Sequence, residues 1–334
     1  MLIIVFHSDI HMESHMSDIS ASRYILSGLT AFSYVVVYSL ASALGLKVEN
    51  VLGVPEALLL VAAIVASASL LNRAPLFRAA LENFLYGTLL VFPITIAVYL
   101  AARSNVPWAD EELRQMDQAL GINWPALIAF VDSRKNLSFV LNIAYRSFHF
   151  QLLILPFMLA STGHVLRSYQ MTIAYAVICF VSCVISIWYP ALGTYSVYHM
   201  DPSNLKYIDG KLATVFLDEL IGIHSNSNFV FDFGRAEGIM TFPSVHAAIA
   251  ALCAWAAWDA KWLRYPMLLL NILMAASAAI VSNHYVVDVI AGIGVAGFCI
   301  SAVSFVTRPR RSAIGSRPQG LNALPVPSIS DISA

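Results

Sequence analysis

Long apolar blocks recur along the chain, and prolines and charged residues separate them. A helix needs about 20 apolar residues to cross the roughly 30 Å hydrocarbon core of a bilayer. Eight blocks reach about this length, at 24–46, 52–72, 82–102, 137–160, 168–189, 242–259, 264–282 and 285–306. Hydrocarbon offers the backbone no hydrogen-bonding partners, so a helix, which pairs its own N–H and C=O groups, is the favoured solution. The pattern predicts an all-α, polytopic membrane helix bundle with about eight transmembrane helices.

Composition supports a membrane protein and excludes other classes. Hydrophobic residues make up 59% of the 334 positions and charged residues only 12%, whereas soluble domains average about 25% charged residues. So few charges cannot cover the surface of a soluble chain of this length. The net charge is -1, and no basic patch indicates a nucleic-acid partner.

The distribution of Lys and Arg predicts the orientation in the membrane. Short loops with excess positive charge stay in the cytoplasm. We therefore expect both termini in the cytoplasm, and the two long connections, 103–136 and 190–241, outside. Trp108 and Trp124 in the first connection favour short helices at the interface. The basic residues that support this orientation are Arg23, Arg73, Arg78, Arg167, Lys261, Arg264, Arg308, Arg310, Arg311 and Arg317.

The same pattern divides the chain into three parts. Residues 1–22 are expected to form a disordered N-terminal tail, without the basic flank and apolar core of a signal peptide. Residues 23–306 form the bundle, with a catalytic region at 137–306. Residues 307–334, rich in Pro, Ser and Arg, are expected to form a disordered cytoplasmic tail.

Three minor patterns carry little chemistry. His7, His11 and His15 would align as a metal-binding face only if a helix formed there, which the expected disorder argues against; Met16 is an alternative start. The string Gly292–Gly297 matches GxGxxG, but it lies inside an apolar block and follows no strand. The cysteines all fall in apolar blocks and are expected to be small buried side chains: Cys179, Cys183, Cys253 and Cys299.

Two polar clusters open apolar blocks on the same predicted side of the membrane. Pro243, Ser244 and His246 begin the sixth block, where free backbone N–H groups and the helix dipole favour an anion. His284 and Asp288 begin the eighth block, and a spacing of four places them on one helical face. A carboxylate bonded to one ring nitrogen makes the other more basic, which suits a nucleophilic histidine. A short hairpin separates the blocks, so the clusters are expected to face one pocket.

These residues resemble the second and third signature motifs of the type 2 phosphatidic acid phosphatase superfamily. The motif Pro-Ser-x-His is matched by Pro243, Ser244 and His246, and His-x-x-x-Asp by His284 and Asp288. The resemblance implies that His284 becomes phosphorylated, Asp288 orients it, His246 protonates the leaving alcohol and Ser244 helps hold the phosphate. It also implies that no metal or other cofactor is needed.

The amino acids at the motif positions are most similar to those of the inositol phosphorylceramide synthase-like branch. The segment Asp117–Trp124 is similar to that branch's bacterial members, which implies a bacterial inner membrane. The orientation expected from Lys and Arg puts the active site on the extracytoplasmic side.

The sequence departs from the superfamily at the cationic groups that hold phosphate. The arginine usually found six residues before the nucleophile is Ala278 here, and the first motif is not recognisable. Arg146, in the fourth apolar block beside Tyr145, and Arg235, just before the second motif, are the expected replacements. The alternative is that Tyr145 and Arg146 have only a structural role and that Arg235 forms an ion pair with Glu237 in the loop.

The predicted function is therefore a lipid phosphatase or phosphotransferase that acts on a lipid phosphate or phospho-headgroup. Water as acceptor makes it a phosphatase, and an alcohol such as inositol or a lipid hydroxyl makes it a transferase. A non-catalytic lipid transporter or scaffold of the same fold is the alternative, favoured by the missing first motif. The vanadium haloperoxidases share the histidines, but their fold is soluble.

Overall fold

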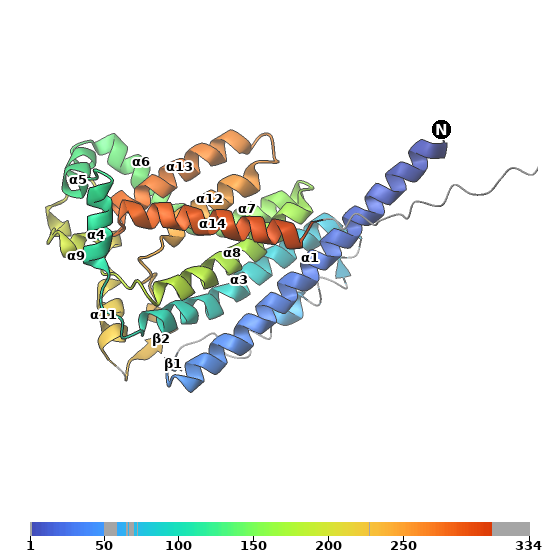
Figure 1. The fold of residues 1–334 in the computed structure, drawn as a ribbon. Helices are drawn as coiled ribbons and strands as arrows, with labels where there is room; N and C mark the ends of the chain where they lie inside the picture. Colours follow the sequence, from blue (N-terminus) through green and yellow to red (C-terminus); the bar gives the residue numbers. More distant parts are fainter. Residues whose placement is uncertain are drawn as a thin grey trace, which may run out of the picture.

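The computed structural model describes residues 2–49, 59–64, 66, 70–71, 73–226 and 228–308, with side chains from residue 18 onward. Long helices run alongside one another and form most of the molecule (Figure 1). They are α1 (Leu2–Ala43), α3 (Pro75–Ala102), α6 (Lys135–Arg146), α7 (Phe148–Ser161), α8 (Val165–Ser186), α12 (Val245–Ala257), α13 (Arg264–Val281) and α14 (Val286–Val306). The predicted all-α membrane bundle is confirmed.

The number of spans differs from the prediction. Within the described residues, five helices are long and apolar enough to cross a bilayer, and the bent pair α6–α7 makes a sixth. Helix α12 is apolar but shorter, and the predicted span 52–72 lies mostly outside the described residues. The count of eight is therefore not confirmed, although these apolar helices make the chain an integral membrane protein.

The expected span 137–160 is a bent pair of helices rather than one straight helix. Helices α6 and α7 meet at Ser147 with a bend of 55°. The Ser147 hydroxyl donates to the Ala144 carbonyl at 2.6 Å, a back-bond that is typical of bent helices. The bend ends α6 at Arg146 and starts α7 beside the candidate site.

Helix α8 lies at the centre of the bundle and contacts α1, α3, α7, α12 and α14. Its buried alanines, Ala174 and Ala176, and those of α12 let helix backbones approach closely, as is common between membrane helices. The buried Glu82 of α3 is fully paired: Arg23 of α1 donates two bonds of 2.7 Å and the Tyr169 hydroxyl of α8 donates one of 2.6 Å. A charge inside a membrane is tolerated when it is paired in this way.

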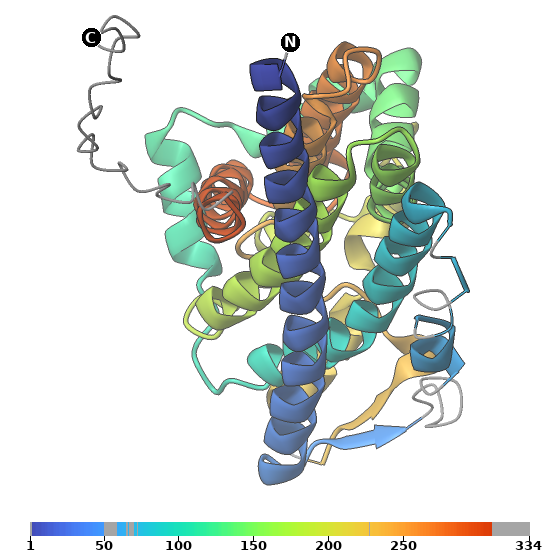
Figure 2. The same cartoon turned by 90° about the vertical axis from the view of Figure 1, so that its right-hand side faces the viewer.

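Short elements gather at one end of the bundle, away from the N-terminus (Figures 1 and 2). They are α4 (Asp110–Ala119), α5 (Trp124–Asp132), α9 (Thr194–Val197), α10 (Lys211–Thr214), α11 (Leu217–Ser225), two 3₁₀ turns (Pro202–Asn204 and Phe233–Arg235) and strands β1 (Lys47–Glu49) and β2 (Val230–Asp232). The strands pair in parallel, with Lys47 opposite Val230. The two long connections predicted from the sequence form this end.

At the N-terminus, α1 begins at Leu2, inside the segment 1–22 for which the sequence predicts a disordered tail. The side chains of His7, His11 and His15 lie outside the described residues, as does the tail beyond residue 308. The four cysteines are free and buried, as expected.

Candidate active site

His284 and Asp288 form a buried pair at the start of α14. The Nδ1 atom of His284 lies 3.3 Å from Oδ2 of Asp288, and both side chains are almost fully enclosed. The same carboxylate oxygen accepts the Tyr285 N–H at 2.9 Å, which fixes the carboxylate at the end of the helix. With Nδ1 directed at the carboxylate, the Nε2 lone pair is available for attack on an electrophile.

Ser244 joins the start of α12 to the start of α14. It is the N-cap of α12, and its hydroxyl accepts the Ala247 N–H at 3.4 Å, while its own N–H donates to the Asp288 carbonyl at 3.0 Å. The two helices are closely packed here, because a Cβ at Gly292 would lie 2.2 Å from the Ser244 carbonyl oxygen. This contact holds the two polar clusters together, as the sequence predicts.

His246, in the first turn of α12, faces His284 across a gap of 6.5 Å between ring centroids. Its ring stacks on Tyr145 at 4.2 Å and 12°, and packs at a tilt of 35° against Phe148, 4.4 Å away between ring centroids. The Tyr145 hydroxyl donates to the Ser282 hydroxyl at 3.0 Å. Tyr145 therefore belongs to the site. It packs against the face of the His246 ring, and its bond to Ser282 connects it to the loop before His284.

A cavity of about 330 Å³ opens between the two histidines. Tyr145, His149, Glu237, His246 and His284 line it together with apolar side chains of α3 and of the segment 212–245. The cavity is large enough for a phosphate group, and it is lined by Val245 and His246 from the first turn of α12, where a helix leaves its N–H groups unpaired. Two imidazoles and a helix N-terminus at one pocket can bind a phosphate, attack it and protonate a leaving group.

The two arginines expected to bind phosphate lie outside this cavity. Arg146 is the last residue of α6, 57% exposed, and its guanidinium pairs with Asp209. Arg235 is 80% exposed and lies 3.7 Å from Asp232 rather than pairing with Glu237. Among the residues that the structure describes, no Lys or Arg lines the cavity, and Ala278 is fully buried. Neither arginine contacts the phosphate pocket in this arrangement.

This placement predicts that Arg146 is dispensable for turnover. We expect Arg146→Lys to keep wild-type activity, and its free energy of unfolding to change by less than about 1 kcal/mol, because an exposed ion pair contributes little. Turnover of a phospholipid donor by the purified variant measures the effect. A loss of tenfold or more would instead show that Arg146 leaves Asp209 and reaches the phosphate.

Sequence reasoning missed Asp117, which holds the start of α14 from outside the bundle. Its two carboxylate oxygens accept the N–H groups of Val286 and Val287, each at 2.9 Å. These are two of the four N–H groups that a helix leaves unpaired at its start. Burial raises the pKa of the Asp117 carboxyl above its ordinary value, and the two N–H donors offset part of that rise. Asp117 therefore positions the segment that carries His284.

Asp110, two turns earlier on the same face of α4, braces the neighbouring loop. Its carboxylate accepts the N–H groups of Leu192 and Gly193 at 2.8 and 2.7 Å, and the Tyr285 hydroxyl at 3.0 Å. Burial raises the pKa of Asp110, and these three donors lower it in part. Gly193 adopts φ +96°, and a Cβ there would meet the Asn283 carbonyl at 2.2 Å, so only glycine fits this close approach. The sequence signal that could have identified Asp110 is the run of acidic residues in the first long connection.

Comparison with known proteins agrees with this geometry. Residues 111–302, more than half of the chain, match a family model described as the PAP2 superfamily. No curated protein and no solved structure matches the chain significantly. The inositol phosphorylceramide synthase-like branch stays a prediction, because the match is at the level of the superfamily. Since the match covers more than half of the chain and contains both histidine motifs, the chain belongs to the PAP2 superfamily, that of the type 2 phosphatidic acid phosphatases.

Proposed function

We propose that this membrane protein is a lipid phosphatase or phosphotransferase that works through a phosphohistidine at His284, on the extracytoplasmic face. The observation that carries the proposal is the pairing of His284 with Asp288 directly across one cavity from His246. Membership of the superfamily supports phosphatase-type chemistry. A transporter or scaffold would need none of these three side chains at a shared pocket.

In the first step, Nε2 of His284 attacks the phosphorus atom of the lipid phosphate. The N–P bond forms as the P–O bond to the leaving alcohol breaks, and His246 gives its proton to the departing oxygen. Asp288 accepts a hydrogen bond from Nδ1–H and stabilises the positive charge that develops on the His284 ring.

In the second step, an O–H group of water or of an alcohol attacks the phosphohistidine. His246, now neutral, removes its proton as the new O–P bond forms and the N–P bond breaks. With a phosphomonoester donor, water releases inorganic phosphate, and inositol or a lipid hydroxyl yields a new phosphomonoester. With a phosphodiester donor, water releases the headgroup phosphate, and an alcohol yields a new phosphodiester. The charge of the phosphate is met by the N–H groups at the start of α12. Ser244, expected from the sequence to help hold the phosphate, is fully buried outside the cavity lining and acts as the N-cap of this turn.

The choice of acceptor is tested with purified protein in detergent. Labelled phosphatidic acid and a labelled phosphoinositol lipid are supplied as donors, each with and without an added alcohol acceptor. Release of phosphate without acceptor identifies a phosphatase, and formation of a new lipid only with acceptor identifies a transferase. Absence of turnover with every phospholipid donor would favour the transporter or scaffold.

The extracytoplasmic position of the site predicts a labelling pattern. Helices α3, α8 and α13 begin at the end of the bundle opposite the start of α14 (Figure 1). Arg73, Arg167, Lys261 and Arg264 lie at or next to these helix starts in the sequence, which favours that end in the cytoplasm. A cysteine at Asn226 should then react with a membrane-impermeant maleimide in intact cells, and one at Ser312 should react only after lysis. The native cysteines are buried and serve as the background control. Reaction at Ser312 alone would invert the orientation.

A further inference from the structure

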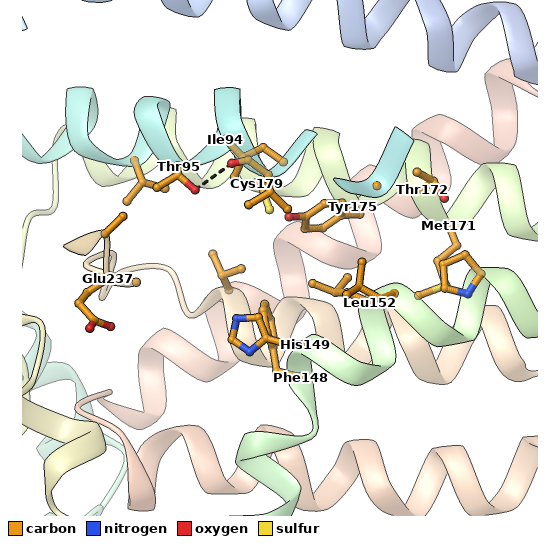
Figure 3. A pocket seen from close by; sticks show the side chains of 18 of the residues that line it. Ile94, Thr95, Phe148, His149, Leu152, Met171, Thr172, Tyr175, Cys179 and Glu237 are labelled. Carbon is orange, nitrogen blue, oxygen red and sulfur yellow. Dashed lines mark hydrogen bonds between the residues drawn. The ribbon is translucent and has the colours of Figure 1, made fainter. Parts of the chain in front are cut away.

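A second cavity, of about 340 Å³, continues from the catalytic pocket into the bundle. The two cavities share walls, among them Phe148, His149, Cys179 and Glu237. In Figure 3, Glu237 lies at one end of the second cavity, His149 lies between, and Met171 and Thr172 lie at the far end. We call this second cavity the slot; it is lined by one face each of α3, α7 and α8.

The slot is long and follows the helix axes. On α3, its lining residues Gly87, Val91, Ile94 and Val98 recur every three or four positions, which defines one helical face. Val98 also lines the catalytic pocket, and Gly87 lies eleven residues away, about 16 Å along the helix. Half of a bilayer's hydrocarbon core is about 15 Å thick. The slot therefore has the length of one leaflet's acyl region.

Beyond His149 and Glu237 at the catalytic end, the walls of the slot are apolar along this length except for the hydroxyls of Tyr175, Thr95 and Thr172. Leu152, Leu153 and Pro156 of α7 face the slot, opposite α3 and α8. The hydroxyls of its threonines are already bonded within the protein: Thr95 donates to the Val91 carbonyl at 2.8 Å, and Thr172 donates to the Asn83 side chain at 2.7 Å. Such a surface suits hydrocarbon and offers little to a polar headgroup.

The slot lies next to the lipid-facing surface of the protein. Leu153 lines both the slot and a shallow apolar depression that Leu81, Phe84, Ile154 and Phe157 complete on the outside of α3 and α7. Phe84 and Ile154 are 40% and 48% exposed. The Leu153 side chain is therefore the wall between the slot and the surface that faces the hydrocarbon of the bilayer.

We propose that the slot binds one hydrocarbon chain of the lipid whose phosphate lies between His246 and His284. The proposal rests on the proposed function, and it adds that Gly87, at the far end, limits the length of chain that the slot accepts. Continuity with the catalytic pocket identifies the occupant, because a chain bound there emerges beside the two histidines.

Photocrosslinking tests the site without requiring turnover. The probe is a phosphatidic acid with a diazirine near the end of one acyl chain, added to the full-length protein in detergent. We expect crosslinks to concentrate on the far end of the slot, around Gly87, Met171 and Thr172. Crosslinks spread evenly over the lipid-facing surfaces of α13 and α14 would overturn the proposal. Crosslinks in the slot without turnover of any donor would leave it standing and refute the proposed function instead.

Chain-length selectivity tests the role of Gly87. A Cβ at this position meets nothing within 4 Å, so Gly87→Phe fills the slot without a backbone clash. We expect kcat/KM to fall about fourfold for each methylene group that the ring displaces, with a loss for dipalmitoyl phosphatidic acid and little change for the dioctanoyl form. Gly294→Phe, equally open but on the lipid-facing side of α14, is the matched control. Equal loss for both chain lengths, or the same selectivity in the control, would contradict the assignment.

Discussion

His284→Ala should lower turnover of a phospholipid donor by about 10⁴-fold or more, because the variant loses the atom that accepts the phosphoryl group. The side chain is buried beside Asp288, and the Asp288 carboxylate keeps the Tyr285 N–H as a donor when the imidazole is removed. The variant should therefore still purify as a folded protein. Initial rates with labelled lipid in detergent, compared with wild type, measure the loss.

Two neighbouring variants serve as graded controls. His246→Ala should slow the reaction about 10²–10⁴-fold for donors with poor leaving groups, because the proton donor is lost. Donors whose leaving alcohol is acidic should be less affected. Asp288→Asn should leave weak activity, since the imidazole remains but loses its carboxylate partner. Undiminished turnover by His284→Ala would refute the phosphohistidine mechanism.

Gly292→Ala should disrupt the site by forcing apart the two helices that carry it. The added Cβ would lie 2.2 Å from the Ser244 carbonyl oxygen and 3.3 Å from the Ala248 nitrogen, so α12 and α14 must move apart. Overpacking of this kind costs about 1–3 kcal/mol of stability. Because His246 and His284 lie on the two separated helices, a displacement on the order of 1 Å should also cost about 10²-fold in turnover. Thermal unfolding in detergent and initial rates measure the two effects.

The same helix provides matched controls for this variant. A Cβ at Gly294 or Gly297 meets nothing within 4 Å, and alanine has a higher helix propensity than glycine. Gly294→Ala and Gly297→Ala should therefore keep activity and stability or gain slightly in stability. If Gly292→Ala behaves like these two, the close contact between α12 and α14 does not hold the site together.

The bundle and the meeting of the two histidine motifs could be predicted from the sequence, because both depend on local pattern. Apolar blocks give the helices, and His246 and His284 each lie at the start of one. Only a short helical hairpin separates the two helices that carry His246 and His284, so they are expected to pack as neighbours. The same reasoning placed Tyr145 at the pocket, where it stacks on His246.

Features that depend on long-range packing could not be predicted. The position of Arg146 follows from the bend at Ser147, which ends α6 and leaves the arginine beside Asp209 instead of the cavity. Asp117 meets the N–H groups of Val286 and Val287 across about half of the chain, and no periodic pattern signals such a contact. The slot forms only when α3, α7 and α8 pack together, so no local sequence pattern indicates it.

The most direct measurement is the covalent label itself. Wild-type protein is exposed briefly to phosphate-labelled lipid, quenched and separated from free lipid, and the retained label is tested for stability. We predict an acid-labile, base-stable label on wild type that maps to His284 and is absent from His284→Ala. A label that persists in His284→Ala, or rapid turnover by wild type with no trapped label, would contradict a phosphohistidine at His284.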